Sequence, residues 1–199
     1  MADLTVDAVR ERYGAVRERA GEGVTVVAAT KYVSVDDLGI LAEAGVEVVG
    51  ENRAQDLLAK HAVYGDTFRW HFIGHLQSNK VKVVNRICEL VHSLDSESAA
   101  RRLSVPALLE VNLSGEASKS GVPPDAIASF LEQTDQIRGL MTMPPLAEEP
   151  EDSRASFRRL AELAREHRLP ELSMGTSQDW EVAVEEGATL IRVGSTLVR

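Results

Sequence analysis

Eight short apolar runs recur along the sequence, and amphipathic helical patterns lie between them. The runs are rich in Val, Ile and Leu, and each predicts a β-strand. They are Val24–Thr30, Val46–Glu51, Arg69–Gly74, Leu90–Leu94, Ala107–Asn112, Ile137–Thr142, Glu171–Gly175 and Thr189–Gly194. A strand–helix–strand unit implies a parallel crossover connection. Eight such units predict an α/β fold, the (β/α)8 TIM barrel, and an open doubly wound sheet is the alternative.

The ends of the chain add two expectations. The segment from about Thr5 to Arg19 predicts an extra N-terminal helix before the first strand. The eighth predicted strand ends a few residues before Arg199, so we expect no helix after it and place the N-terminal helix in that position of the outer ring. The length of 199 residues is near the lower limit of about 200 for this fold. We therefore expect one domain over residues 1–199.

Charge and cysteine content limit the classes of partner. The formal net charge of -9 argues against a broad basic surface for nucleic acid. The single cysteine, Cys88, excludes an internal disulfide and suits a reducing, cytoplasmic setting. No apolar run approaches the length that spans a membrane. We expect a cytoplasmic monomer or weak dimer that binds neither nucleic acid nor membrane.

Two histidines are spaced like a helical metal pair. His71 and His75 are four residues apart, but the first belongs to a predicted strand, where four residues span roughly 13 Å. That separation is too long for one zinc ion. We therefore predict no metal site.

The carboxyl ends of barrel strands meet at one face, which carries the active sites of this fold. Lys31 follows the first predicted strand. Two interpretations are open, because the lysine is either the polar residue where a strand leaves the core or a placed reactive amine. The loops Ser173–Asp179 and Val193–Val198 follow strands seven and eight and are rich in Gly, Ser and Thr. Such loops bind phosphate at this position of the fold, although ordinary turn chemistry also explains them.

An amine opposite a phosphate site is suited to a cofactor with both an aldehyde and a phosphate. Pyridoxal 5′-phosphate has both groups, and Lys31 would form the Schiff base. Arg192 is two residues before Gly194, so both lie on one face of the eighth strand. A guanidinium stays protonated and would donate to the ring nitrogen of the cofactor, which disfavours protonation of that nitrogen. The ring would then be a weaker electron sink.

Several longer motifs occur in the order in which one family carries them. They are AATKY, VVGENRAQDLLAKH, WHFIGHLQSNKVKVV, HSLDS, LLEVNLSGEASKSGV, IRGLMTMPP, LSMGTSQD and LIRVGS. From about Val24 to Ser195 the chain resembles the pyridoxal phosphate homeostasis protein family. That resemblance implies a fold similar to the barrel domain of alanine racemase, without the second domain of the racemase.

The resemblance also implies six cofactor-binding residues. Lys31 would carry the aldimine, Arg192 would face the pyridine nitrogen, and Asn52 would lie beside the cofactor. The phosphate would be held by small residues of the last two loops, which are Ser177, Gly194 and Ser195. The family usually has methionine at the position of Thr176, so we expect the phosphate contacts to differ in detail.

The resemblance implies a role in intracellular vitamin B6 homeostasis. It also implies no catalytic activity, since none is established for the family. The alternatives are a racemase-like enzyme of the same cofactor and a barrel that binds another phosphorylated metabolite or a protein partner. A racemase of this type needs a tyrosine on the opposite ring face from the lysine. The tyrosines here are Tyr13, Tyr32 and Tyr64, none ends a predicted strand, and Tyr32 is expected to point away from Lys31. We therefore assign no catalytic residue.

Overall fold

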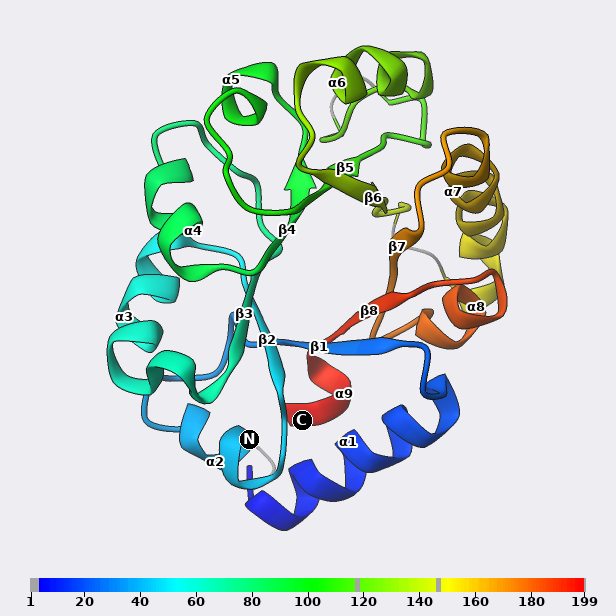
Figure 1. Ribbon diagram of the computed structural model, residues 1–199. Coiled ribbons are helices and arrows are strands. Elements are labelled where there is room, and N and C mark those ends of the chain that lie inside the picture. Colours follow the sequence, from blue (N-terminus) through cyan, green and yellow to red (C-terminus); the bar gives the residue numbers. More distant parts are fainter. Residues whose placement is uncertain (1–3, 117–118, 146–147, 199) are drawn as a thin grey trace.

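The computed structural model describes residues 4–116, 119–145 and 148–198, and its strands form a closed parallel barrel (Figure 1). Neighbouring strands pair in chain order, and β1 also pairs with β8, for example Val27 with Arg192. This last pairing confirms the TIM barrel and excludes the open sheet. The strands are β1 Thr25–Ala29, β2 Val48–Glu51, β3 Arg69–Phe72, β4 Leu90–Leu94, β5 Ala107–Glu110, β6 Ile137–Met141, β7 Glu171–Thr176 and β8 Leu190–Val193.

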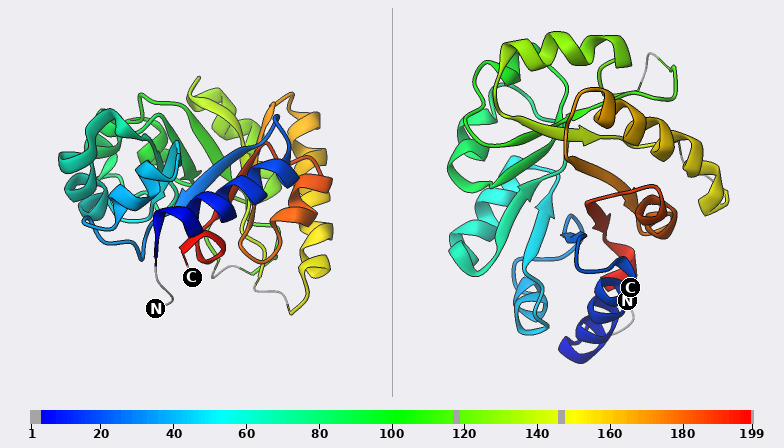
Figure 2. Two further views of the ribbon diagram at one scale, coloured as in Figure 1. Left: turned by 90° about the horizontal axis from the view of Figure 1, so that it is seen from below. Right: turned by 45° about the vertical axis from the view of Figure 1, so that its right-hand side comes forward.

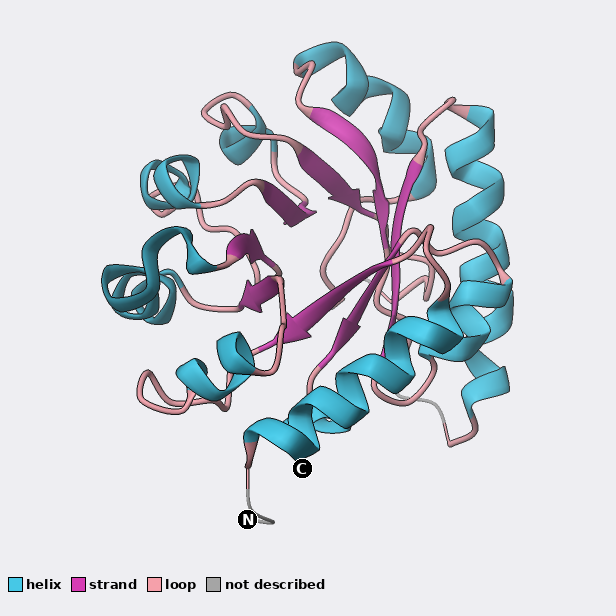
Figure 3. Cartoon of the chain, turned by 60° about the horizontal axis from the view of Figure 1, so that its bottom comes forward, coloured by secondary structure: helices cyan, strands magenta, loops and turns pink. Residues whose placement is uncertain are grey.

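Helices surround the barrel on its outer side (Figure 3). Those that follow strands are α2 Leu38–Glu43, α3 Ala54–Tyr64, α4 Val81–Ile87, α5 Glu97–Ala100, α6 Ile127–Gln133, α7 Arg154–Glu166, α8 Trp180–Glu185 and α9 Ser195–Val198. Short 3-10 turns lie at η1 Gly65–Thr67, η2 Pro124–Ala126 and η3 Pro150–Ser153. Several of these helices have only one or two turns, which is how a chain this short completes the ring.

The predicted N-terminal helix is α1 Val6–Ala20, shown in blue in Figure 2. It begins where the side chain of Thr5 accepts a hydrogen bond from the backbone N–H of Ala8 at 3.3 Å. Its buried residues recur every three or four positions, so one face packs inward. The helix lies against α2, α8 and α9. It therefore occupies the expected place in the outer ring.

The expectation that no helix follows the eighth strand is wrong. Helix α9 forms a single turn in which the N–H groups of Leu197 and Val198 donate to the carbonyl of Gly194 at 2.9 and 3.2 Å. The side chain of Leu197 is completely buried. Four residues are enough for one hydrogen-bonded turn when an apolar side chain anchors it in the core.

The core has two parts. The larger part lies between the strands and the helices, and the smaller part fills the barrel interior. The interior cluster consists of Val27, Val48, Leu90, Leu108, Met141 and Leu190, with Ile73 packed against it. Because strand residues alternate between faces, Arg192 points into the same interior as Leu190. The interior is thus apolar in part and also carries buried polar side chains.

Within the described residues, no helix is long and apolar enough to cross a membrane. The same residues contain no cluster of three or more potential metal ligands of the His, Cys, Asp or Glu type. His71 lies on β3, as predicted, whereas His75 lies in the loop beyond that strand and contacts Asp95 at 3.3 Å.

Candidate functional site

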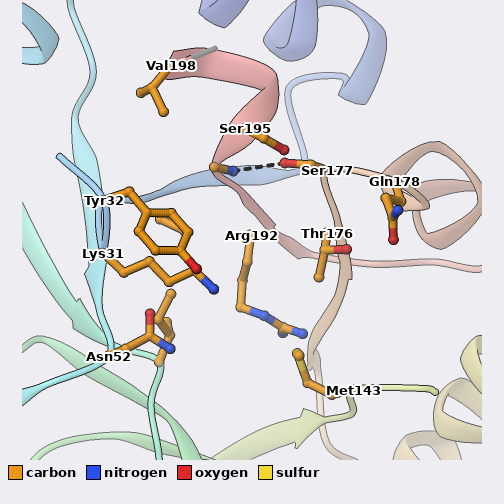
Figure 4. A pocket seen from close by; sticks show the side chains of 13 residues that line it. Lys31, Tyr32, Asn52, Met143, Thr176, Ser177, Gln178, Arg192, Ser195 and Val198 are labelled. Atoms are coloured by element: carbon orange, nitrogen blue, oxygen red, sulfur yellow. Dashed lines mark hydrogen bonds between the residues drawn. The ribbon is translucent and has the colours of Figure 1, made fainter. Parts of the chain in front are cut away.

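A cavity of about 370 Å³ opens at the carboxyl ends of the strands (Figure 4). Its volume lies in the range of roughly 300–1,000 Å³ that is usual for small-molecule sites. All six residues predicted for the site line it, namely Lys31, Asn52, Ser177, Arg192, Gly194 and Ser195. The other lining residues are Ala29, Tyr32, Ile73, Met143, Thr176, Gln178 and Val198. The closed barrel brings these residues together from both ends of the chain.

Lys31 lies in a turn beyond the end of β1. The N–H of Val33 donates to the carbonyl of Thr30 at 2.9 Å, so Lys31 and Tyr32 occupy the two corner positions of the turn. The Lys31 side chain is exposed, and its Nζ lies 4.9 Å from the centre of the Tyr32 ring. An accessible amine therefore lies at the rim of the cavity.

The expectation that Tyr32 points away from Lys31 is wrong, because both side chains line the cavity. The expectation assumed the alternation of a strand, but β1 ends at Ala29. A β-turn follows, and its corner residues do not alternate between the faces of a sheet. Figure 4 shows the Tyr32 ring and the Lys31 side chain in the same part of the cavity.

A buried ion pair holds the first residue of this turn in place. Lys60, on α3, donates to the carboxylate of Glu51 and to the carbonyl of Thr30, the latter at 2.7 Å. The hydroxyl of Thr30 donates to the same Glu51 oxygen at 2.5 Å. The Lys60 and Glu51 side chains are only 5% and 0% exposed. The pair thus ties the end of β1, and with it Lys31, to β2 and α3.

Ser177 joins the loops that follow β7 and β8. Its hydroxyl oxygen accepts from the backbone N–H of Gly194 at 3.0 Å and from that of Thr196 at 3.3 Å. The carboxylate of Asp179 accepts from the N–H of Thr176 at 2.7 Å and from the Thr176 hydroxyl at 3.1 Å. Hydroxyl and backbone N–H groups therefore gather at one end of the cavity. The hydroxyl of Thr176, at a position where the family usually has methionine, donates to Asp179.

Arg192 lies deep in the cavity and is almost completely buried. Its guanidinium donates to the hydroxyl oxygen of Ser173 and to the carbonyl of Thr142, the latter at 3.1 Å. In the described part of the chain it forms no ion pair. Burial lowers the pKa of Arg192 to about 10, against the opposing charges of Glu110 and Asp179. The group is thus a positively charged donor near neutral pH, held by uncharged acceptors.

Asn52 and Met143 line other parts of the cavity. Asn52 follows β2 and does not begin the next helix, because Arg53 occupies that position. Its Oδ1 atom is buried and, among the described residues, has no hydrogen-bond partner. The Met143 side chain is 57% exposed and lies at the mouth. A ligand in the cavity would therefore meet an unused amide oxygen and an apolar edge.

Sequence reasoning missed some of the lining residues. Ile73 and Met143 follow the third and sixth strands, so the rule that the site collects residues beyond strand ends would have found them. Lys60 gave no such signal, because it lies on a helix that does not reach the cavity.

The family model described as alanine racemase, N-terminal domain, matches residues 4–199. A pyridoxal phosphate homeostasis protein of Aquifex aeolicus is 41% identical over 213 aligned positions, which cover 95% of this chain and 93% of the relative. The chain belongs to the pyridoxal phosphate homeostasis protein family. A homeostasis protein of Pseudomonas aeruginosa is 42% identical and covers 77% of this chain and 74% of its own.

Solved structures agree with this family. PipY of Synechococcus elongatus, determined with PLP bound, superposes with a TM-score of 0.86 at 35% identity and covers 96% of this chain and 100% of PipY. Alanine racemase of Corynebacterium glutamicum superposes with a TM-score of 0.74 at 15% identity. This chain covers 61% of that racemase, so the likeness shows a shared barrel.

Proposed function

We propose that this chain binds pyridoxal 5′-phosphate in the cavity at the barrel mouth and serves in intracellular vitamin B6 homeostasis. The observation that carries the proposal is the meeting of three groups in one cavity. These groups are the exposed amine of Lys31, the hydroxyl and N–H groups around Ser177, and the buried guanidinium of Arg192. The PLP-bound structure of PipY, at 35% identity, supports the same cofactor.

The residues fit this cofactor. When bound, it would supply an aldehyde that condenses with the Lys31 amine with loss of water. Ser177, Gly194 and Ser195 would hold the phosphate, since small residues let backbone and hydroxyl donors approach an anion closely. The buried Oδ1 of Asn52 is an acceptor without a protein partner among the described residues, which suits a polar ring substituent.

Arg192 would oppose catalysis by the bound ring. The guanidinium is charged and forms no ion pair in the described part of the chain, and its hydrogen bonds to Ser173 and Thr142 use two of its five N–H donors. Other donors are left for a ring nitrogen. A charged donor at that nitrogen disfavours its protonation. A ring that is not protonated withdraws electrons weakly, and this supports holding the cofactor rather than reacting through it.

The alternative function, amino-acid racemisation, requires acid–base groups on opposite faces of the ring. Tyr32 is the tyrosine that lines the cavity. It comes from the same turn as Lys31, and its ring centre is 4.9 Å from the Lys31 amine. Two adjacent corner residues approach a ligand from one side. This supports the non-catalytic proposal, and we assign no catalytic residue.

The wider setting is also a proposal. We propose that residues 1–199 act as one binding domain, in the cytoplasm, as a monomer or weak dimer. The exposed Lys31 amine supports exchange of the cofactor with amines from solution. The net charge of -9 supports partners other than nucleic acid.

Absorption spectroscopy tests the proposal. Purified protein titrated with pyridoxal phosphate should gain a visible band that saturates at one cofactor per chain. Lys31→Ala should lose the band, whereas Lys82→Ala, on the exposed face of α4, should keep it. No band in the wild-type protein would refute the proposal. Loss of stereochemistry at Cα when the loaded protein is incubated with amino acids would favour the racemase.

A further inference from the structure

A chain of buried polar side chains continues from Arg192 into the barrel interior. The Ser173 hydroxyl accepts from Arg192 and lies 2.7 Å from Nδ1 of His92. Nε2 of His92 lies 2.9 Å from Nδ1 of His71. All four side chains are at least nine-tenths buried, and they come from β8, β7, β4 and β3. The chain thus crosses the barrel interior, where apolar packing would be expected.

One assignment of donors and acceptors along this row of side chains also gives the buried Ser173 hydrogen an acceptor. A guanidinium can only donate, so the Ser173 oxygen accepts from Arg192, and among the described residues the Ser173 hydrogen has no acceptor other than Nδ1 of His92. A neutral His92 then carries its proton on Nε2 and donates to Nδ1 of His71. His71 in turn carries its proton on Nε2. The direction of each hydrogen bond follows from the arginine and from the single acceptor that the Ser173 hydrogen has among the described residues.

Burial keeps both histidines neutral. It lowers the pKa of His71 to about 3, and the charge of Arg69 adds to the shift. Burial also lowers the pKa of His92 well below its usual value, and His71 and Arg192 act in the same direction. The two neutral histidines and Ser173 therefore add no charge beside Arg192. They supply a fixed acceptor without the carboxylate that would neutralise the guanidinium.

We propose that His92 and His71 are positioning residues for the cofactor site. His92 orients the Ser173 hydroxyl so that its oxygen accepts from Arg192, and His71 fixes the tautomer of His92. The guanidinium is thereby held at the floor of the cavity with its positive charge available to a bound ring. The proposal rests on the proposed function for its effect on the cofactor, whereas the tautomers are a property of the protein alone.

The row of hydrogen-bonded side chains from Arg192 to His71 does not act as a proton relay. A relay needs every member to accept and to donate in turn, and Arg192 does not accept while it is charged. Reversal of all the hydrogen bonds, that of Arg192 included, would require a neutral arginine. The chain is therefore a fixed support for the donor, like the neighbours that hold a metal-binding histidine in one orientation.

Nitrogen-15 NMR of the histidine rings in the full-length protein tests the assignment. His71→Gln and His92→Asn identify the two sets of signals. We expect both rings to be neutral at pH 6 with the proton on Nε2. A charged ring, or a proton on Nδ1 of His92, would overturn the proposal whether or not the protein binds pyridoxal phosphate.

Two substitutions at one position test the effect on the site. Asparagine places its amide oxygen near the position of Nδ1, so His92→Asn retains the acceptor for Ser173, and His92→Leu removes it. We expect His92→Leu to weaken pyridoxal phosphate binding about tenfold and to shift the visible band, whereas His92→Asn keeps both close to wild type. A folded His92→Leu protein with wild-type affinity and spectrum would overturn the proposal.

Controls separate the possible failures. Borohydride reduction labels Lys31 only when the cofactor occupies the site, so labelling of each variant shows that the cofactor is still bound there. If the proposed function fails, the wild-type protein itself carries no label. If His92→Leu does not fold, Ser173→Ala serves in its place and should weaken binding to the same extent. If neither variant folds, the tautomers that nitrogen-15 NMR finds for the two histidines decide whether the proposal stands.

Discussion

Removal of the Lys60 amine should destabilise the protein and loosen the turn that holds Lys31. In Lys60→Met the Glu51 carboxylate keeps a single hydrogen bond, from the Thr30 hydroxyl at 2.5 Å, and its second oxygen has no partner among the described residues. Breaking a buried pair in this way costs about 3–5 kcal/mol. For a chain of this size that corresponds to a fall in Tm of about 6–20 °C.

Equilibrium unfolding in urea, followed by circular dichroism, measures the loss. Glu51→Gln combined with Lys60→Met removes the buried charge together with its partner, so the double variant should be more stable than Lys60→Met alone. Pyridoxal phosphate should also bind more weakly to Lys60→Met, because the Thr30 carbonyl loses the amine that donates to it at 2.7 Å. A loss below about 1 kcal/mol, with no recovery in the double variant, would show that the pair does not support the site.

Three further predictions follow from burial and backbone geometry. Because burial lowers the pKa of His71 to about 3 and of His92 well below 6.5, the unfolded chain binds more protons than the folded one below pH 6.5. The unfolding free energy should therefore fall as the pH falls from 7 towards 4, by up to about 1.4 kcal/mol per pH unit for each histidine, and equal urea midpoints at pH 7 and pH 5 would contradict this. Gly175→Ala should lower the free energy of unfolding by about 1–3 kcal/mol or more, because Gly175 has φ +88° and an added Cβ would lie 2.6 Å from that of Ala183. An unchanged urea midpoint would refute this prediction. Burial raises the pKa of the Cys88 thiol to about 12, so a disulfide reagent should react with it only in denaturant, and rapid reaction of the native protein would be the contrary result.

Local sequence patterns account for the barrel and for most of the cavity. The strands were visible because buried parallel strands are continuous apolar runs, and the closed barrel then brings the residues beyond their ends to one mouth. Lys31, Arg192 and Gly194 were placed together by that logic alone. The role of Asn52 beside the cofactor came from the family resemblance.

The remaining features depend on contacts that a local pattern does not contain. The orientation of Tyr32 depends on a turn that begins at Thr30, and α9 depends on one buried leucine. The pairing of Lys60 with Glu51 joins a helix to a strand end. The histidine chain joins four strands, and its members are ordinary polar residues within apolar runs. Each feature required the three-dimensional packing of the barrel.

The most direct test of the central claim is the position of the covalent bond to the cofactor. The protein is incubated with pyridoxal phosphate, reduced with borohydride, digested and mapped by mass spectrometry, with Lys82→Ala treated in parallel. We expect one reduced pyridoxyl group on Lys31 in both proteins. A label on another lysine, or none, would contradict the assignment of Lys31 as the amine that holds the cofactor.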